Sequence, residues 1–160
     1  MTDWEIEIRP CRRDEWEVLA DHEYAMWRDI GAAPDQIRPD WRARTLRFVE
    51  DAAECRQFAA FAALAEGRIV GSACGQIWAG LSPDVLEPHY KCKGYIWGVY
   101  VAPPHRGQGI ARALTAAVTA HLQSVGCTQI HLDASPAGRP VYEKLGFAPS
   151  NGMRLMVKNE

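Results

Sequence analysis

The sequence shows neither an excess of charge of one sign nor a long apolar run. Its 160 residues include 18 basic and 20 acidic side chains, which give a formal net charge of -2 at pH 7. This balance provides no general attraction to nucleic acid or to an anionic membrane, so we expect neither as a partner. No segment is apolar over the roughly 20 residues that a membrane-spanning helix needs. Residues 1–9 carry acidic side chains where a signal peptide would have a basic start, so a cytoplasmic location is expected.

Cysteine pairs of the kind that hold metals or build disulfide frameworks are also missing. The chain has five cysteines, an odd number, and none belongs to a Cys-x-x-Cys motif. His89 and Cys92 have a ligand-like spacing, but no second pair of ligands lies at a useful distance in the sequence. We therefore expect reduced thiols and no metal. The cysteines are Cys11, Cys55, Cys74, Cys92 and Cys127.

The most informative stretch runs from residue 95 to residue 125. Residues 95–101, Tyr-Ile-Trp-Gly-Val-Tyr-Val, have the composition of a buried strand, which Pro103 and Pro104 end. A glycine-containing turn follows, and from Ile110 onward apolar residues recur at helical spacing. Peptide N–H groups in such a turn and in the first helical turn lack intrahelical partners, and the helix dipole adds partial positive charge. The pattern predicts a backbone anion site suited to a pyrophosphate.

Two familiar nucleotide-binding signatures do not fit this turn. A dinucleotide fingerprint needs a third glycine at position 112, where this chain has Arg112. A Walker loop needs Gly-Lys followed by Ser or Thr, and this turn has no such tripeptide. Both of these nucleotide-binding interpretations therefore fail for this turn.

Two segments resemble signatures of the GNAT superfamily of acyl-CoA-dependent N-acyltransferases. Residues 106–111, Arg-Gly-Gln-Gly-Ile-Ala, match its Arg/Gln-x-x-Gly-x-Gly/Ala signature. Residues 135–147, Ser-Pro-Ala-Gly-Arg-Pro-Val-Tyr-Glu-Lys-Leu-Gly-Phe, are similar to its C-terminal signature, Asn-x-x-Ala-x-x-Leu-Tyr-Glu-x-x-Gly-Phe. Ser135 stands where the family has asparagine, and Gly138 stands where it has alanine. The order and separation of the two segments also match the family.

The resemblance implies a mixed α/β (α+β) fold and a single GNAT-like domain over residues 1–160. Its centre is a mostly antiparallel sheet of six to seven strands, flanked by about four helices and splayed at the cofactor strand. Sequence periodicity gives matching elements. Strands are expected at residues 4–9, 58–64, 68–78, 95–101 and 129–134, from residue 147, and at 153–157; helices are expected at 12–30, 41–55, 110–125 and 141–145. Residues 79–93 are expected to form a long loop.

The same resemblance implies roles for individual residues. Tyr142 would donate a proton to the CoA thiolate as it leaves, since a phenol with an ordinary pKa of roughly 10 is protonated near neutrality. Backbone groups of residues 99–101 would bind pantetheine as an added strand, and N–H groups near Val99 could polarise the thioester carbonyl. The turn and the first helical turn would hold the pyrophosphate. The expected cofactor-binding residues are Val99, Tyr100, Val101, Arg106, Gly107, Gln108, Gly109, Ile110, Ala111, Arg112 and Ser135.

The sequence alone does not identify the general base or the acceptor amine. Candidates for a base that deprotonates an ammonium acceptor are Glu87 and His89 in the long loop, Asp133, and water relayed through Tyr95. Several aromatic residues would suit an apolar or planar amine, and each would equally suit a protein core. Acidic loop residues would suit a cationic small molecule. The aromatic candidates are Tyr24, Trp27, Trp41, Trp78, Tyr90 and Trp97.

These expectations lead to one principal function and two alternatives. The principal function is an enzyme that moves an acetyl group from acetyl-CoA to a primary amine of a small molecule, by direct attack in a ternary complex. The first alternative is acetylation of a peptide or protein amine. The second is a non-catalytic acyl-CoA-binding sensor, which has no need of a leaving-group acid at Tyr142. Because GNAT enzymes often pair, a homodimer is also left open.

Overall fold

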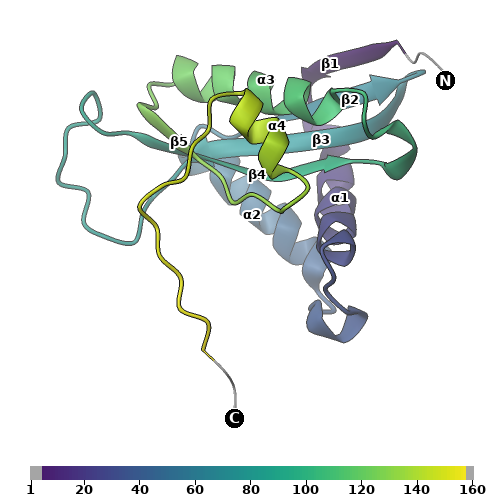
Figure 1. The fold of residues 1–160 in the computed structure, drawn as a ribbon, viewed down its shortest axis with the longest axis horizontal. Coiled ribbons are helices and arrows are strands. Elements are labelled where there is room, and N and C mark those ends of the chain that lie inside the picture. Colours follow the sequence, from purple (N-terminus) through teal and green to yellow (C-terminus); the bar gives the residue numbers. More distant parts are fainter. Residues whose placement is uncertain (1–4, 158–160) are drawn as a thin grey trace.

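The computed structural model describes residues 5–157, which form one sheet with helices on both faces (Figure 1). The strands are β1 (Ile6–Pro10), β2 (Ala59–Ala65), β3 (Arg68–Ile77), β4 (Lys93–Val101) and β5 (Gln129–His131). The α-helices are α1 (Trp16–Asp29), α2 (Trp41–Cys55), α3 (Ile110–Ser124) and α4 (Arg139–Lys144). Short 3-10 helices precede α1, α2 and α3: η1 (Arg13–Glu15), η2 (Pro34–Gln36) and η3 (Pro103–His105). The four α-helices agree with those expected from the sequence periodicity.

The strands lie side by side in chain order, from β1 to β5. Neighbours from β1 to β4 pair antiparallel, and β4 pairs parallel with β5. The hairpin between β2 and β3 turns at Glu66 and Gly67, whose φ angles are +49° and +75°. Positive φ at both positions suits the tight turn whose twist matches that of hairpin strands. The parallel step from β4 to β5 needs a crossover, which α3 supplies.

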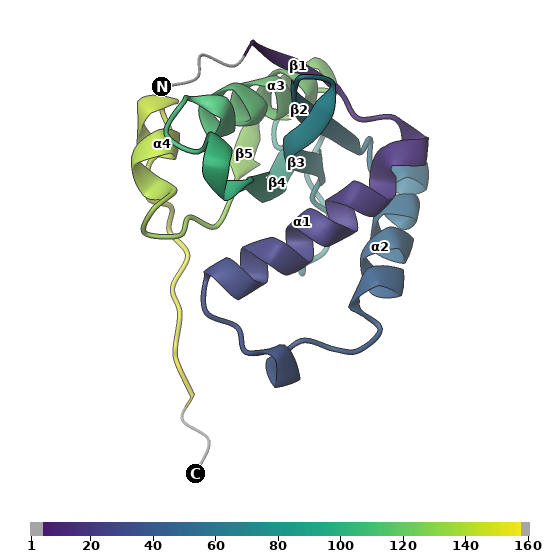
Figure 2. The same cartoon turned by 90° about the vertical axis from the view of Figure 1, so that its right-hand side faces the viewer.

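Helix α3 covers one face of the sheet, and α1 and α2 cover the other (Figure 2). Small residues in β3 let α3 lie close, because a Cβ at Gly75 would fall 2.2 Å from Cγ1 of Val118. Val118 and Leu122 of α3 are fully buried on this side, and Leu19 of α1 and Val49 of α2 are buried on the other. Strand β4 is therefore held between packed layers.

β4 and β5 are neighbours over only part of their length. Residues 93–95 of β4 pair with residues 129–131 of β5. Beyond this point β4 continues to Val101 with no strand beside it on that edge among the described residues. The backbone of residues 96–101 is therefore open to another extended chain on one side, as the expected splay requires.

The opposite edge of β4 contains a bulge at Gly98. Trp97 lies opposite Cys74 and Tyr100 lies opposite Ser72, so β4 has one residue more than β3 between these pairs. Gly98 has a φ of +63°, which residues with a Cβ seldom adopt. The bulge interrupts the ladder in the middle of the β4 segment that lines the cavity described below.

The described residues contain five strands, so the expectation of six to seven is not confirmed. β5 ends at His131, and neither the segment from residue 147 nor residues 153–157 form a strand. The chain after α4 runs away from the sheet (Figures 1 and 2), and Met153 is 99% exposed. Pro149 has no N–H to donate to a ladder, which disfavours pairing here. Residue 4 of the first expected strand lies outside the described residues.

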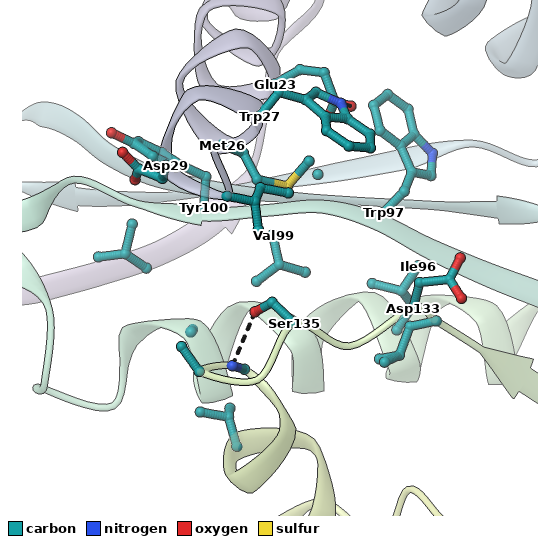
Figure 3. Close-up of a pocket in the computed structure, with 18 of the residues that line it drawn as sticks. Glu23, Met26, Trp27, Asp29, Ile96, Trp97, Val99, Tyr100, Asp133 and Ser135 are labelled. Atoms are coloured by element: carbon teal, nitrogen blue, oxygen red, sulfur yellow. Dashed lines mark hydrogen bonds between the residues drawn. The ribbon is translucent and has the colours of Figure 1, made fainter. Parts of the chain in front are cut away.

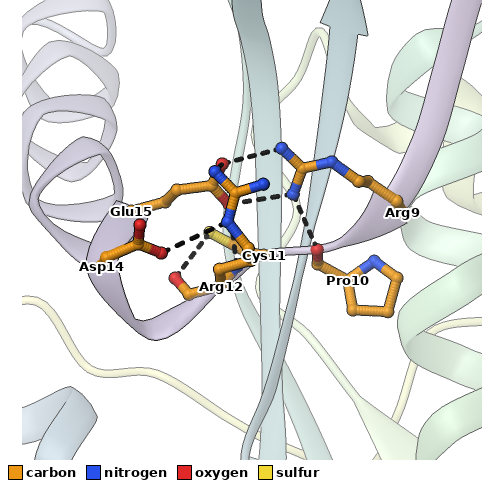
Figure 4. Close-up of polar contacts among 6 residues, drawn as sticks. All are labelled: Arg9, Pro10, Cys11, Arg12, Asp14 and Glu15. Atoms are coloured by element: carbon orange, nitrogen blue, oxygen red, sulfur yellow. Dashed lines mark hydrogen bonds and ion pairs between the residues drawn. The ribbon is translucent and has the colours of Figure 1, made fainter.

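Glu15 joins β1 to the start of α1 (Figure 4). Arg9 donates two hydrogen bonds to its carboxylate, at 2.9 and 2.7 Å, and the backbone N–H of Arg12 donates a third at 2.8 Å. These bonds, led by those from Arg9, lower the pKa of the Glu15 carboxyl to about 2. The cluster fixes the entry into α1, the helix that forms one wall of the cavity.

Residues 78–92 form the long loop that the sequence predicts, between β3 and β4. Several of its apolar side chains are exposed, among them Leu81 and Tyr90. Across residues 5–157, no helix combines the length and the apolar character needed to cross a membrane.

Candidate active site

A cavity of about 1360 Å³ opens where β4 separates from β5 (Figure 3). Helices α1 and α2 form one wall, and the turn into α3 and the loop from β5 to α4 form the other. The strand β4, from Tyr95 to Val101, runs between the two walls. A pocket for one small molecule usually measures about 300–1,000 Å³. This cavity is therefore larger than a typical pocket for one small molecule.

The turn into α3 presents a row of peptide N–H groups without partners. The N–H groups of residues 107–112 donate no hydrogen bond within residues 5–157, and Ala113 is the next to donate, to the Gly109 oxygen at 3.0 Å. Gly107 and Gly109 have φ angles of +78° and +79°, and a Cβ at either position would have no heavy atom within 4 Å. Such a turn directs successive N–H groups into one concavity at the positive end of the helix. The geometry is that of an anion site.

Arg106, expected among the cofactor-binding residues, lines the cavity, but protein groups hold its side chain. Its Nε donates to the Val101 oxygen at 2.8 Å, and its guanidinium pairs with Asp29 of α1. The same guanidinium lies 5.6 Å from the centroid of the Tyr100 ring. Arg106 therefore fastens the turn to β4 and α1.

Most of the other expected cofactor-binding residues also line the cavity. They are Val99, Tyr100, Val101, Gly107, Gly109, Ile110, Ala111, Arg112 and Ser135. Gln108 is exposed and does not line it. Ile110 turns its side chain into the core, where it is 4% exposed, so only its backbone can serve a ligand.

Tyr142 lies on α4, beyond Ser135. The Ser135 hydroxyl oxygen accepts a hydrogen bond from the Gly138 N–H at 3.1 Å, which holds the start of α4 (Figure 3). A Cβ at Gly138 would fall 3.0 Å from Cε2 of Tyr142, so a glycine here gives the ring room. Burial raises the pKa of the Tyr142 phenol above its ordinary value of 10. The phenol is therefore protonated at neutral pH, as a proton donor must be.

Tyr95 and Asp133 close the cavity at the end where the two strands separate. The Tyr95 hydroxyl donates to Oδ2 of Asp133 at 2.7 Å. Burial, followed by this hydrogen bond, raises the pKa of the Tyr95 phenol. This hydrogen bond links β4 to the chain that follows β5. The phenolic proton of Tyr95 is therefore engaged with the Asp133 carboxylate.

The wall made by α1, α2 and β4 is aromatic and contains the partly buried carboxylate of Glu23. Trp27 and Phe48 are 51% and 50% exposed, and the Phe48 ring meets the Trp97 ring edge to face at 5.3 Å. Oε1 of Glu23 accepts a hydrogen bond from Nε1 of Trp27 at 2.8 Å, while its Oε2 is buried without a hydrogen-bond partner among the described residues. Burial raises the pKa of the Glu23 carboxyl above its ordinary value of 4.5. Figure 3 shows this wall across β4 from Ser135.

Several other candidates lie away from the cavity. The rings of Tyr24 and Trp41 pack on each other with centroids 4.7 Å apart. Glu87 and His89 are exposed in the long loop and do not line the cavity. Of the aromatic candidates, Trp27 and Trp97 line it, and Tyr24, Trp41, Trp78 and Tyr90 do not.

Glu23 was not predicted from the sequence, although a signal was present. It follows Leu19 and Ala20 and precedes Trp27 at helical spacing, so it falls on the apolar stripe of α1. Carboxylates are rare on such a stripe unless they are paired or functional. Its position on the apolar stripe could therefore have identified Glu23 as a candidate functional residue.

The model of the Acetyltransferase (GNAT) family matches residues 7–147 of this sequence. The chain belongs to the GNAT family of acetyltransferases. The match includes the turn into α3 and the Tyr142 segment, so it confirms the resemblance noted in the two motifs.

Curated relatives of this GNAT protein match over part of their length. A glucosamine 6-phosphate N-acetyltransferase of Trypanosoma brucei brucei is 38% identical over 94 residues, which are 56% of this chain and 58% of the relative. A mycothiol acetyltransferase of Actinosynnema mirum is 42% identical over 64 residues, which are 38% of this chain and 21% of the relative. The matches therefore cover at most 58% of these relatives.

Solved structures share the fold over nearly the whole chain. A GCN5-related N-acetyltransferase of Ralstonia eutropha JMP134 has a TM-score of 0.76 and 24% identity, with 95% of this chain and 98% of that chain covered. A predicted acetyltransferase of Clostridium acetobutylicum, solved with acetyl-CoA, has a TM-score of 0.78 and 22% identity, with 95% of this chain and 96% of that chain covered. At these identities the likeness concerns the fold.

Proposed function

We propose that this GNAT protein is an acetyl-CoA-dependent N-acetyltransferase that acetylates a primary amine of a small molecule by direct attack in a ternary complex. The observation that carries the proposal is the two-sided cavity. One side holds the protonated phenol of Tyr142 and the N–H groups of residues 107 and 109–112, which have no hydrogen-bond partner within residues 5–157. The other side, across β4, holds a partly buried carboxylate among aromatic rings.

The cofactor side suits the separate parts of acetyl-CoA. The N–H groups of residues 107–112 bind the pyrophosphate, since unpaired N–H groups at a helix N-terminus favour an anion. The open edge of β4 at Val99, Tyr100 and Val101 bonds to the amide groups of pantetheine as to an added strand. Ser135 holds the loop that completes this side. Bound acetyl-CoA supplies the acetyl group as an activated thioester.

Two features near the bulge serve the reaction itself. In this proposal, N–H groups next to Gly98 polarise the acetyl carbonyl, which is supported by the interruption of the β3–β4 ladder at the bulge. Tyr142 gives its phenolic proton to the sulfur as the carbon–sulfur bond breaks. The names of the relatives, which include an amino-sugar phosphate as substrate, support a small-molecule acceptor.

The proposal is tested by CoA release, followed by thiol detection, over a panel of small primary amines, polyamines and peptides. An amine from the small-molecule group should stimulate release. Tyr142→Phe should then lower kcat by about 10²-fold, because general acids contribute about 10²–10⁴-fold, while the affinity for acetyl-CoA stays the same. Tyr90→Phe, at a position 72% exposed in the long loop, is the matched control and should match the wild type.

Other results would favour the alternatives. If only peptides stimulate CoA release, the acceptor is a peptide or protein amine and not a small molecule. Binding of acetyl-CoA without release in any member of the panel would favour a sensor. An unchanged kcat in Tyr142→Phe would remove the proton-donor role and leave the transferase function standing.

A further inference from the structure

Glu23 lies directly over the bulge of β4. A Cβ at Gly98 would fall 3.3 Å from its Oε2, so the glycine leaves beside the carboxylate a space that any other residue would narrow. Gly98 also adjoins Val99, whose backbone faces the proposed thioester site. The carboxylate therefore borders the point where an acceptor nitrogen would have to meet the acetyl carbon.

The two carboxylate oxygens of Glu23 differ in their surroundings. Oε1 accepts the indole N–H of Trp27, whereas Oε2 is buried with no hydrogen-bond partner within residues 5–157. A buried polar atom without a partner is costly and rare, so it needs an explanation. Oε2 is sealed from water in this conformation, but Glu23 itself lines the cavity, so a small rotation of its side chain would bring Oε2 to a positively charged N–H donor bound there. That donor would supply the missing partner with a charge-assisted hydrogen bond.

The aromatic rings around Glu23 indicate which kind of chemical group would carry such an N–H donor. Trp27, Phe48 and Trp97 line the cavity beside the carboxylate. The two half-exposed rings, Trp27 and Phe48, leave apolar surface that an incoming group can cover. Aromatic faces also attract an ammonium group. The subsite therefore suits a primary ammonium attached to an apolar or planar group.

We infer that Glu23 is the general base for the acceptor amine, which is a primary amine carried by an apolar or planar group. This inference rests on the proposed transferase function. Glu23 removes one proton from the bound ammonium, leaving a neutral amine. The nitrogen forms a bond to the acetyl carbon while the carbon–sulfur bond breaks, and the sulfur leaves with the electron pair and takes the proton of Tyr142. The second proton of the nitrogen goes to water, and water restores the proton of Tyr142 as Glu23 releases its own.

Burial supports this assignment, because it raises the pKa of Glu23 toward the range in which a carboxylate can hold a proton during turnover. The hydrogen bond from Trp27 opposes that shift to a smaller extent. Other titratable or charged groups along the cavity or behind Glu23 are His22 and Asp29 on α1; Arg44, Arg47 and Asp51 on α2; Cys74 on β3; Tyr95 on β4; His105, Arg106 and Arg112 near the start of α3; and Asp133 and Tyr142 beyond β4.

The test measures kcat and KM for the most active amine of a panel that includes 2-phenylethylamine, tryptamine, hexylamine, spermidine and a dipeptide. In Glu23→Gln, kcat at pH 7 should fall by about 10²-fold with unchanged affinity for acetyl-CoA. The defect should shrink as the pH approaches the pKa of the amine itself, because solvent then removes the proton. Glu23→Asp, with a shortened carboxylate, should keep more activity than Glu23→Gln. Glu17→Gln, on the exposed face of the same helix, should match the wild type.

The possible results distinguish a failure of the role assigned to Glu23 from a failure of the proposed transferase function. If amines stimulate release equally in Glu23→Gln and the wild type, Glu23 is not the base and the transferase function stands. If Glu23→Gln raises KM while kcat stays constant, Glu23 binds the acceptor and another group takes the proton. If spermidine or the dipeptide is far better than the apolar amines, the acceptor class is wrong. If no amine stimulates release from bound acetyl-CoA, both the transferase function and the role of Glu23 are refuted.

Discussion

Replacing Glu23 with glutamine should stabilise the fold at neutral pH even as it removes activity. The wild-type carboxylate holds Oε2 in a buried position without a partner among the described residues. A buried unsatisfied group costs about 1–3 kcal/mol, and more when it is charged. Glutamine keeps an acceptor for Trp27 Nε1 and removes the charge, although its amide N–H groups also lack a partner. We expect a net gain of about 1–2 kcal/mol in the free energy of unfolding.

The gain in unfolding free energy of Glu23→Gln over the wild type should increase as the pH rises. Because the pKa of Glu23 is raised in the folded protein, the folded state binds this proton more tightly than the unfolded chain does. Its contribution to stability is therefore greatest below the unfolded-state pKa and is lost as the pH rises through the folded-state pKa. Glutamine does not titrate, so the advantage of Glu23→Gln should be small at about pH 4 and should grow as the pH rises through the folded-state pKa of Glu23.

Thermal unfolding at a series of pH values measures this directly. For a chain of this length, 1 kcal/mol corresponds to about 2–4 °C in Tm, so Tm at pH 7 should rise by about 2–8 °C. Glu17→Gln is the control for loss of a negative charge from α1. A Tm of Glu23→Gln at or below that of the wild type at pH 7 would refute the reasoning. So would an advantage of the same size at pH 4.

Three further predictions concern other parts of the fold. Gly75→Ala places a methyl group 2.2 Å from Cγ1 of Val118 and should lower the unfolding free energy, measured with urea, by about 1–3 kcal/mol; an unchanged midpoint would contradict the close packing of α3. Gly109→Ala disfavours a φ of +79° by about 1–2 kcal/mol and should weaken acetyl-CoA binding in calorimetry by about tenfold, whereas equal affinity would exclude the turn as the pyrophosphate site. Glu15→Gln should lower Tm at pH 7, and the difference should vanish as the pH falls through the pKa of about 2; a constant difference would mean that the ion pair with Arg9 contributes nothing.

The local elements of the cofactor side could be predicted because they depend on neighbours in the chain. The turn at Gly107 and Gly109 needs glycines where φ is positive, and the helix after it needs only its own apolar period. The hairpin at Glu66 and Gly67 is predictable for the same reason. The family match over residues 7–147 confirms that these signals identify the family.

The strand count and the functional surroundings of single residues could not be predicted in this way. A strand forms only if it can pair with the edge of another strand and pack on an apolar surface. Among the described residues, residues 153–157 have neither a partner strand nor an apolar surface to pack on. Arg106 belongs to the glycine motif, yet its guanidinium pairs with Asp29, which is 77 residues away in the chain. Both outcomes depend on distant segments, about which local periodicity carries no information.

The order of the residues alone settles the family, the helices and the position of the glycine turn before α3, because these follow from motifs and from spacing within single elements. The proposed acceptor site depends on packing between elements. Glu23 on α1, Phe48 on α2 and Gly98 on β4 come together only when both helices cover one face of the sheet. The burial that raises the pKa of Glu23 and leaves its Oε2 without a partner exists only in that assembly, because desolvation is a property of the folded surroundings.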